Sequence, residues 1–145
     1  MNVKVKKLSE SATLPTYGSE FSAGADLYAC LSGNVVILPG KTCMIPTGLA
    51  MEIPEGYGGF IYARSGLSVK KGLAPANKVG VVDADYRGEI MVALHNHSEE
   101  ERVVSHGERI AQMVIAPFLK VFFEEADSLE DTARGEGGFG STGKV

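Results

Sequence analysis

The sequence lacks several features that would mark whole classes of protein. No apolar run approaches the ~20 residues of a membrane-spanning helix, so we expect no membrane partner. No apolar stretch follows the basic N-terminal residues, so we expect no secretory signal and a cytoplasmic location. An excess of positive charge is also missing, because the net charge is -4. A nucleic-acid coat needs a basic face that displaces counterions from phosphates, so we expect no nucleic-acid partner.

Cysteine is scarce, and the chain shows no internal repeat and no long amphipathic helical pattern. In a chain without a secretory signal, Cys30 and Cys43 are expected to be reduced, small apolar core residues. The 145 residues leave room for one domain with its own core. A hydrophobic content of 44% with 22% charged residues is typical of a soluble globular protein.

Glycine and proline separate short β-rich runs along the chain, which predicts an all-β sandwich or barrel. One short helix is predicted from Ser65 to Lys71, where Ser65 can cap the helix and Gly72 can stop it. The predicted strands cover residues 26–31, 35–38, 42–53, 59–63, 79–82, 89–97, 102–105, 110–118 and 121–124.

Two of the strand patterns indicate which strand faces are exposed or buried. Lys4, Lys6 and Lys7 alternate with valines, which indicates the solvent face of a first strand. From Ile90 to Leu94 the apolar residues fill both pleat faces, as expected of a strand that is buried on two sides. In a chain this small, we expect another subunit to supply the second cover.

Two pairs of residues have ordinary structural interpretations. His95 and His97 lie on one strand face and could hold a metal, but no third ligand is recognisable, so we expect a surface or interface pair. Phe122 and Phe123 are expected to pack near the end of the last strand rather than to form a stacking platform.

The C-terminal residues 134–145, RGEGGFGSTGKV, combine glycines with cations, hydroxyls and one aromatic ring. Glycine backbones can turn N–H groups toward an anion, and successive N–H groups form an anion-binding concavity. The ring of Phe139 could stack on a base. Residues 138–144 also match the start of a Walker A loop, but that loop must leave a strand and open a helix, and Val145 stands where Ser or Thr should follow, so we reject that match. A flexible tail is the alternative interpretation of this segment.

Two further segments carry groups suited to phosphate chemistry. Arg64, Ser65 and Gly66 place a guanidinium, a hydroxyl and a glycine N–H at a strand-to-helix transition, where N–H groups attract phosphate. A capped surface helix is the alternative. Asp83 and Asp85 would share one face of an extended segment, and a carboxylate there could act as a general base for water. On local evidence alone, a polar turn is the more ordinary interpretation.

Taken together, these segments resemble the trimeric deoxyuridine triphosphate nucleotidohydrolases (dUTPases), from about Ala12 to Gly143. Each motif alone is weak, but five occur in the order typical of that family. Ala25 and Ala63 depart from residues common in the family, which concerns local packing only. The motifs are AGADLY at 23–28, ARSGL at 63–67, NKVGVVDADYRG at 77–88, GERIAQ at 107–112 and RGEGGFGSTG at 134–143.

The resemblance implies a jelly-roll β-sandwich with one short helix, organised as a β domain at 1–132 and a flexible Gly-rich arm at 133–145. It implies a homotrimer with active sites shared between subunits, in which the arm closes over the site. The reaction would be hydrolysis of dUTP to dUMP and pyrophosphate with Mg²⁺. Such a reaction keeps uracil out of DNA and supplies dUMP for dTMP synthesis.

The resemblance also implies a role for individual residues. Asp83 would be the catalytic base for a water that attacks the α-phosphorus. Asp26 and Gln112 would reach Mg²⁺ through water, the ion being held mainly by the triphosphate. The hairpin from 77 to 83 would bind uracil, Tyr86 would lie against the deoxyribose, and the arm would cover uracil and the γ-phosphate. The implied substrate-binding residues are Arg64, Ser65, Gly66, Asn77, Gly80, Val81, Val82, Tyr86, Met91, Gln112, Arg134, Phe139, Gly140 and Ser141.

Two alternatives share this architecture. A deoxycytidine triphosphate deaminase would carry a second serine at position 66 and an arginine further along the helix, whereas this chain has Gly66 and Lys70. A non-catalytic jelly-roll nucleotide sensor would be expected to lack Asp83 or the arm, and both are present.

Overall fold

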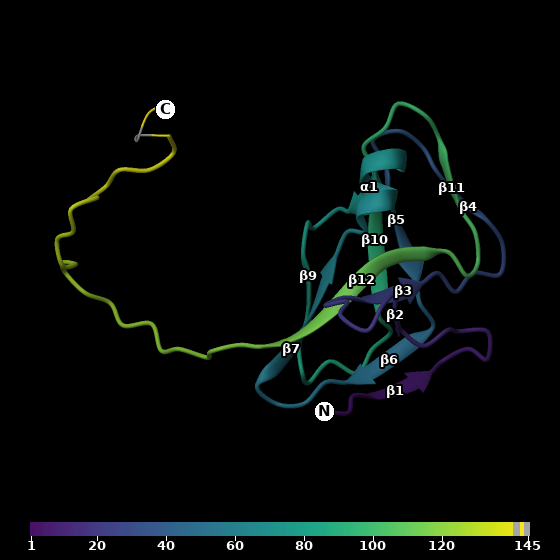
Figure 1. The fold of residues 1–145 in the computed structure, drawn as a ribbon, viewed down its shortest axis with the longest axis horizontal. Coiled ribbons are helices and arrows are strands. Elements are labelled where there is room, and N and C mark those ends of the chain that lie inside the picture. Colours follow the sequence, from purple (N-terminus) through teal and green to yellow (C-terminus); the bar gives the residue numbers. More distant parts are fainter. Residues whose placement is uncertain (141–142, 144–145) are drawn as a thin grey trace.

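The computed structural model of the chain describes residues 1–140 and 143, and over these residues it is built mainly of strands (Figure 1). The elements are β1 (Lys4–Lys7), β2 (Thr16–Tyr17), β3 (Ala25–Tyr28), β4 (Val35–Ile37), β5 (Thr42–Pro46), β6 (Leu49–Glu52), β7 (Tyr57–Tyr62), α1 (Ser65–Lys71), β8 (Leu73–Pro75), β9 (Gly80–Val82), β10 (Met91–Asn96), β11 (Arg102–Val104) and β12 (Arg109–Pro117). No described helix is long and apolar enough to cross a membrane.

The strands form antiparallel sheets around one hydrophobic core. The largest sheet has the order β2-β3-β12-β7-β9, and a second sheet has the order β5-β10-β8. Two further pairs, β1-β6 and β11-β4, complete the fold. Side chains from both larger sheets meet in the core, among them Leu27 and Ala111 from the first sheet and Ile45 and Leu94 from the second. The all-β sandwich predicted from the strand pattern is confirmed.

Strand β10 differs from the prediction of burial on two sides. Val92 and Leu94 point into the core, whereas Met91 is exposed and Ala93 and His95 are only half-buried. Within the single chain, β10 is therefore buried on one face only. The predicted cover from a second subunit stays a prediction.

Two other strand predictions are wrong. The run 42–53 forms two strands, because Gly48 lies between them with φ +69° and a Cβ there would meet Cys30 Sγ at 2.9 Å. The run 121–124 is not a strand, and Phe122 and Phe123 are fully exposed instead of packed. An apolar run predicts a strand only where a partner supplies the hydrogen bonds.

The ends of α1 were predicted with mixed success. Gly72 ends the helix in a left-handed conformation (φ +67°), and its N–H donates to the carbonyls of Leu67 and Ser68. The predicted cap at Ser65 is wrong, because Arg64 occupies the N-cap position and makes no side-chain capping hydrogen bond.

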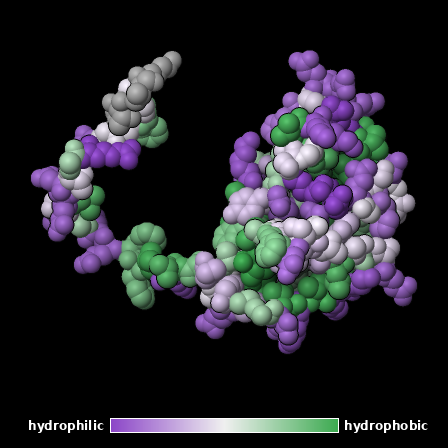
Figure 2. Space-filling model, viewed as in Figure 1, coloured by the Kyte–Doolittle hydropathy of each residue, from purple (hydrophilic) through white to green (hydrophobic). Residues whose placement is uncertain are grey.

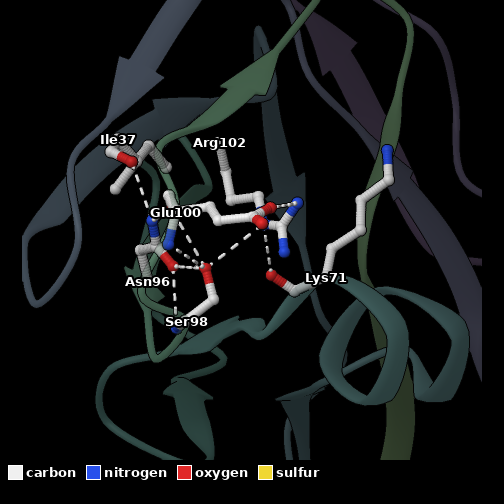
Figure 3. A network of polar contacts seen from close by, with 6 residues as sticks. All are labelled: Ile37, Lys71, Asn96, Ser98, Glu100 and Arg102. Atoms are coloured by element: carbon white, nitrogen blue, oxygen red, sulfur yellow. Dashed lines mark hydrogen bonds and ion pairs between the residues drawn. The ribbon is translucent and has the colours of Figure 1, made fainter.

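A polar network fixes the C-terminal end of α1 to the turn after β10 (Figure 3). The buried side chain of Asn96 donates to the carbonyl of Ile37 (2.8 Å), and its oxygen accepts from the N–H and hydroxyl of Ser98 (2.9 and 2.7 Å). Arg102 Nε donates to the carbonyl of Lys71 (2.8 Å) and to Ser98 Oγ (3.2 Å). Because α1 buries only Leu67, these contacts contribute much of what positions the helix.

After Pro117 the chain leaves the body as an extended segment (Figure 1). Figure 2 shows hydrophobic side chains gathered where this segment begins. The exposed apolar residues there include Leu119, Val121, Phe122 and Phe123. Cys30 and Cys43 are free and half-buried, so the expectation of reduced cysteines is confirmed, although neither is a fully buried core residue.

Candidate active site

Residues of the first, second and fourth motifs meet in one pocket of about 340 Å³. Strand β12 lies between β3 and β7 in the sheet, and Gln112 pairs with Asp26 on one side and with Tyr62 on the other. This register brings the second motif, which follows β7, to the first. The pocket is lined by Gly18, Ser22, Ala23, Gly24, Asp26, Arg64, Ser65, Gly66, Arg109 and Gln112.

The carboxylate of Asp26 holds two guanidinium groups in this pocket. Arg64 Nε lies 2.8 Å from Asp26 Oδ1, and Arg109 Nη1 lies 3.3 Å from Oδ2. Asp26 is 9% exposed, so its charge needs such partners in order to be buried. Both oxygens of Asp26 are therefore engaged by arginines, which leaves the carboxylate better suited to contact a metal through water than directly.

Arg109 is a site residue that the sequence reasoning missed, although it lies in the motif GERIAQ. In a regular strand, Arg109 and Gln112 would point to opposite faces, because side chains alternate. The pairing of β12 with β3 shifts between Arg109 and Ala111, which is a β-bulge. A bulge turns the side chains that precede it, so Arg109 and Gln112 line the same pocket.

Gln112 and Gly24 fit closely against one another. The Gln112 amide Nε2 donates to the carbonyl of Ala63 (2.8 Å), which ties β12 to the residue before Arg64. A Cβ at position 24 would overlap Gln112 Oε1 and come within 3.1 Å of Gln112 Cβ, so a side chain there would displace the Gln112 amide. The amide oxygen is thereby held in the pocket wall, where it can accept a hydrogen bond from a water.

A second pocket of about 290 Å³ contains the residues predicted for the base and the sugar. It is formed by β9, by the turns before and after β9, and by the start of β10. Strands β5 and β7 each contribute one side chain. The predicted residues are joined by Met44, Ile61, Glu89 and Ile90, which the sequence reasoning did not select. The pocket is lined by Met44, Ile61, Asn77, Gly80, Val81, Val82, Asp83, Tyr86, Glu89, Ile90 and Met91.

The walls of this second pocket are closely packed. The hydroxyl of Tyr86 donates to the carbonyl of Glu89 (2.9 Å), and a Cβ at Gly88 would overlap the Tyr86 ring. A Cβ at Gly80 would come within 3.3 Å of Ile61 and 3.4 Å of Asn77. A side chain at either glycine would therefore have to displace these neighbours.

Asp83 lies at the C-terminal end of β9 with an exposed side chain. Its backbone carbonyl accepts the N–H of Tyr86 (3.2 Å), which closes the turn that follows. Asp83 also borders a larger hollow of about 810 Å³ that Asp85 and the start of the extended segment line. Asp85 does not line the second pocket, so of the two carboxylates only Asp83 faces it.

The two pockets have no lining residue in common. Arg134, Phe139 and Gly140 lie in the extended segment and line neither pocket. Arg134 Nε donates to the carbonyl of Gly137 (2.6 Å), and the ring of Phe139 is fully exposed. Ser141 falls outside the described residues. Within the described part of the chain, the two pockets and the residues predicted to close over the site are thus apart.

Among the described residues, no group of three or more His, Cys, Asp or Glu side chains is placed to hold a metal ion. The expectation of an ion held mainly by substrate oxygens stays a prediction. Asp26 and the oxygen of Gln112 fit contact with such an ion through its waters, because Mg²⁺ usually keeps several of them.

The chain is similar to known proteins in sequence and in fold. A family model described as dUTPase matches residues 10–143. The deoxyuridine 5'-triphosphate nucleotidohydrolase of Syntrophotalea carbinolica is 49% identical over 143 residues, which cover 99% of this chain and 97% of that protein. A mutant dUTPase of Staphylococcus bacteriophage 80alpha, solved with dUpNHpp, has a TM-score of 0.89 and 30% identity and covers 99% of each chain.

A third similar protein is a mutant dUTPase from phage phi11 of S. aureus, whose structure describes the coordination of a structural Mg(II) ion. It has a TM-score of 0.81 and 25% identity, and the match covers 90% of this chain and 100% of that one. The likeness to these structures confirms the jelly-roll β-sandwich. The chain therefore belongs to the dUTPase family, and it is an enzyme that hydrolyses dUTP.

Proposed function

We propose that the chain converts dUTP to dUMP and pyrophosphate by attack of water on the α-phosphorus, with Asp83 as the general base. The observation that carries this proposal is the position of Asp83, which directly follows β9 and lines the pocket around that strand. An exposed carboxylate is ionised at neutral pH and can accept a proton from a bound water.

Selection of the substrate would take place in the pocket around β9. Asn77 and the backbone from Gly80 to Val82 would bind the uracil edge, with Met91 on the adjoining strand. The closely packed wall at Gly80 supports rejection of the additional methyl group of thymine. Tyr86, fixed by its hydrogen bond to Glu89, would lie against the deoxyribose and exclude a ribose 2'-hydroxyl.

The triphosphate would lie in the pocket around Asp26. Arg64 and Arg109 would meet the negative charge, and Ser65 and the N–H of Gly66 would donate hydrogen bonds. Asp26 supports this arrangement, because it fixes both guanidiniums before substrate arrives. A Mg²⁺ ion bound to the triphosphate would neutralise charge there, and Asp26 and Gln112 would orient its waters. The divalent ion described for the phi11 relative supports a metal requirement.

We also propose that the working enzyme is a homotrimer with shared sites, a β domain at 1–132 and a closing arm at 133–145. The separation of the two pockets and the exposed apolar residues after Pro117 support this assembly. In a cyclic trimer, the phosphate pocket, the Asp83 pocket and the arm would come from three different subunits. Arg134, Phe139, Gly140 and Ser141 would then close over uracil and the γ-phosphate and exclude water.

The reaction can be tested with a panel of nucleotides. The protein would be incubated with dUTP, dCTP, dTTP and UTP in the presence of Mg²⁺, and both pyrophosphate and ammonia would be measured. We expect pyrophosphate from dUTP, little from the other three, and no ammonia. Ammonia from dCTP would indicate the deaminase alternative, and neither product would indicate a nucleotide sensor. In the cytoplasm, the proposed reaction keeps uracil out of DNA and supplies dUMP for dTMP synthesis.

Site sharing can be tested by complementation. Equal amounts of an Asp83→Asn protein and a protein truncated after Thr132 would be unfolded and refolded together. With random assortment, about three quarters of trimers are mixed and each has one intact site in three, so about a quarter of wild-type activity should return. No recovery, with mixed trimers confirmed by mass spectrometry, would contradict the shared-site arrangement.

A further inference from the structure

The side chain of Tyr86 is oriented by residues that follow it in the chain. Its ring lies over Gly88, where a Cβ would overlap it, and its hydroxyl donates to the carbonyl of Glu89 (2.9 Å). The backbone of Tyr86 is held separately, because its N–H donates to the carbonyl of Asp83 (3.2 Å) and its carbonyl accepts from Arg87 Nη1 (3.2 Å). Tyr86 is 46% exposed, so packing alone does not fix the ring. The direction of the ring therefore depends on where the Glu89 carbonyl lies.

Glu89 is itself anchored to the turn between β5 and β6. Its carboxylate Oε1 accepts the N–H of Gly48 (2.9 Å) in a half-buried position. The next residue, Ile90, is joined to the same turn, because its N–H donates to the carbonyl of Leu49 (2.7 Å). The Ile90 carbonyl also accepts the hydroxyl of Thr47 (2.6 Å), and both of these side chains are buried. The turn is therefore part of the packed body and gives Glu89 a fixed point of attachment.

The contact between Glu89 and Gly48 is of a strong kind. A backbone N–H that donates to an ionised carboxylate makes a charge-assisted hydrogen bond, which is stronger than one between neutral groups. Gly48 presents this N–H from a left-handed conformation (φ +69°), and its own carbonyl accepts the N–H of Leu8 (2.7 Å). The direction of the Gly48 N–H is thus set by the fold. One residue, Glu89, joins this fixed donor to the hydroxyl of Tyr86.

We propose that Glu89 is a positioning residue for sugar selection, which acts through Tyr86. This inference rests on the proposed function, in which Tyr86 lies against the deoxyribose. The bond to Gly48 holds Glu89 so that its carbonyl accepts the Tyr86 hydroxyl, and the ring then stays where a ribose 2'-hydroxyl would clash. The role requires an acceptor oxygen that reaches Gly48, and it does not require the negative charge of Glu89.

Two conservative variants separate reach from charge. Glu89→Gln keeps an acceptor oxygen at the same reach and removes the charge, whereas Glu89→Asp keeps the charge and is one methylene group shorter. The measured quantity is the ratio of kcat/KM for dUTP to that for UTP. We expect Glu89→Gln to keep this ratio and Glu89→Asp to lower it about tenfold or more, because a small misplacement at a binding site is costly.

Glu108 supplies a matched control. It is also half-buried, and its Oε1 likewise accepts a backbone N–H, that of Ser105 (3.2 Å), but it lines neither nucleotide pocket. Glu108→Asp should therefore leave the dUTP-to-UTP ratio unchanged. The dUTP-to-dCTP ratio of Glu89→Asp should also be kept, because selection of the base does not pass through Tyr86. General damage to the fold would lower both ratios, and the melting temperature of each variant would reveal it.

A double-mutant cycle tests the route through the hydroxyl. Tyr86→Phe removes the hydroxyl, so Glu89→Asp should lower the dUTP-to-UTP ratio little further in that background. A ratio unchanged by Glu89→Asp, or lowered equally by Glu89→Gln, would overturn the proposal while Tyr86→Ala still lowered the ratio. If Tyr86→Ala also left the ratio unchanged, the contact of Tyr86 with the sugar would be wrong, and the role of Glu89 with it.

Discussion

Replacement of Asp26 by asparagine is the perturbation with the clearest expected consequence. The substitution keeps the shape of the side chain and removes the charge that holds Arg64 and Arg109. Loss of one partner from a buried ion pair costs about 3–5 kcal/mol. Here the side chains of Arg64 and Arg109 are 26% and 51% exposed, so water can solvate the freed guanidiniums. We therefore expect a loss of about 2 kcal/mol, which lowers the melting temperature by about 5–8 °C in a chain of this size.

The same change should also affect catalysis, because guanidiniums that are not held would have to be ordered when substrate binds. We expect kcat/KM for dUTP to fall about tenfold or more, with a weaker affinity for pyrophosphate. Differential scanning calorimetry and steady-state kinetics would be compared with those of Asp127→Asn, a matched change in the exposed segment. If Asp26→Asn melted within about 1 °C of wild type and kept its kcat/KM, the carboxylate would not be organising the phosphate pocket.

Four other predictions follow from the same arrangement. Asp83→Asn should keep dUTP affinity but lose turnover by about 100-fold or more; turnover within a few-fold of wild type would point to Asp85 as the base. Tyr86→Ala should weaken discrimination between dUTP and UTP while uracil selection survives, as competition kinetics with UTP and dCTP would measure. Truncation after Thr132 should leave the melting temperature nearly unchanged and strongly reduce activity, since a glycine arm buries little apolar area. Arg102→Met should lower the urea-derived unfolding free energy by about 1–2 kcal/mol, because the Lys71 carbonyl loses its donor; an unchanged urea midpoint would contradict that role.

Several features of the protein were determined by the sequence alone. The short β-rich runs and the rarity of helical periodicity indicated an all-β sandwich, because the alternation of buried and exposed side chains is a local property of strands. Gly72 was correctly predicted to end the helix, because glycine adopts the left-handed backbone conformation of that position without steric cost. The motifs also identified the family, because residues that bind a common substrate recur in a common order.

Other features were decided by tertiary structure, and each depends on a partner distant in the chain. Arg109 joins the pocket around Asp26 through a β-bulge, which depends on the pairing of β12 with β3. The position of Asp26 between two arginines depends on three elements that meet in space. Phe122 and Phe123 have the composition of a strand but no strand partner within the described chain. Local patterns report propensity, whereas pairing, ion-pair partners and exposure depend on contacts between distant segments, which no single stretch of sequence encodes.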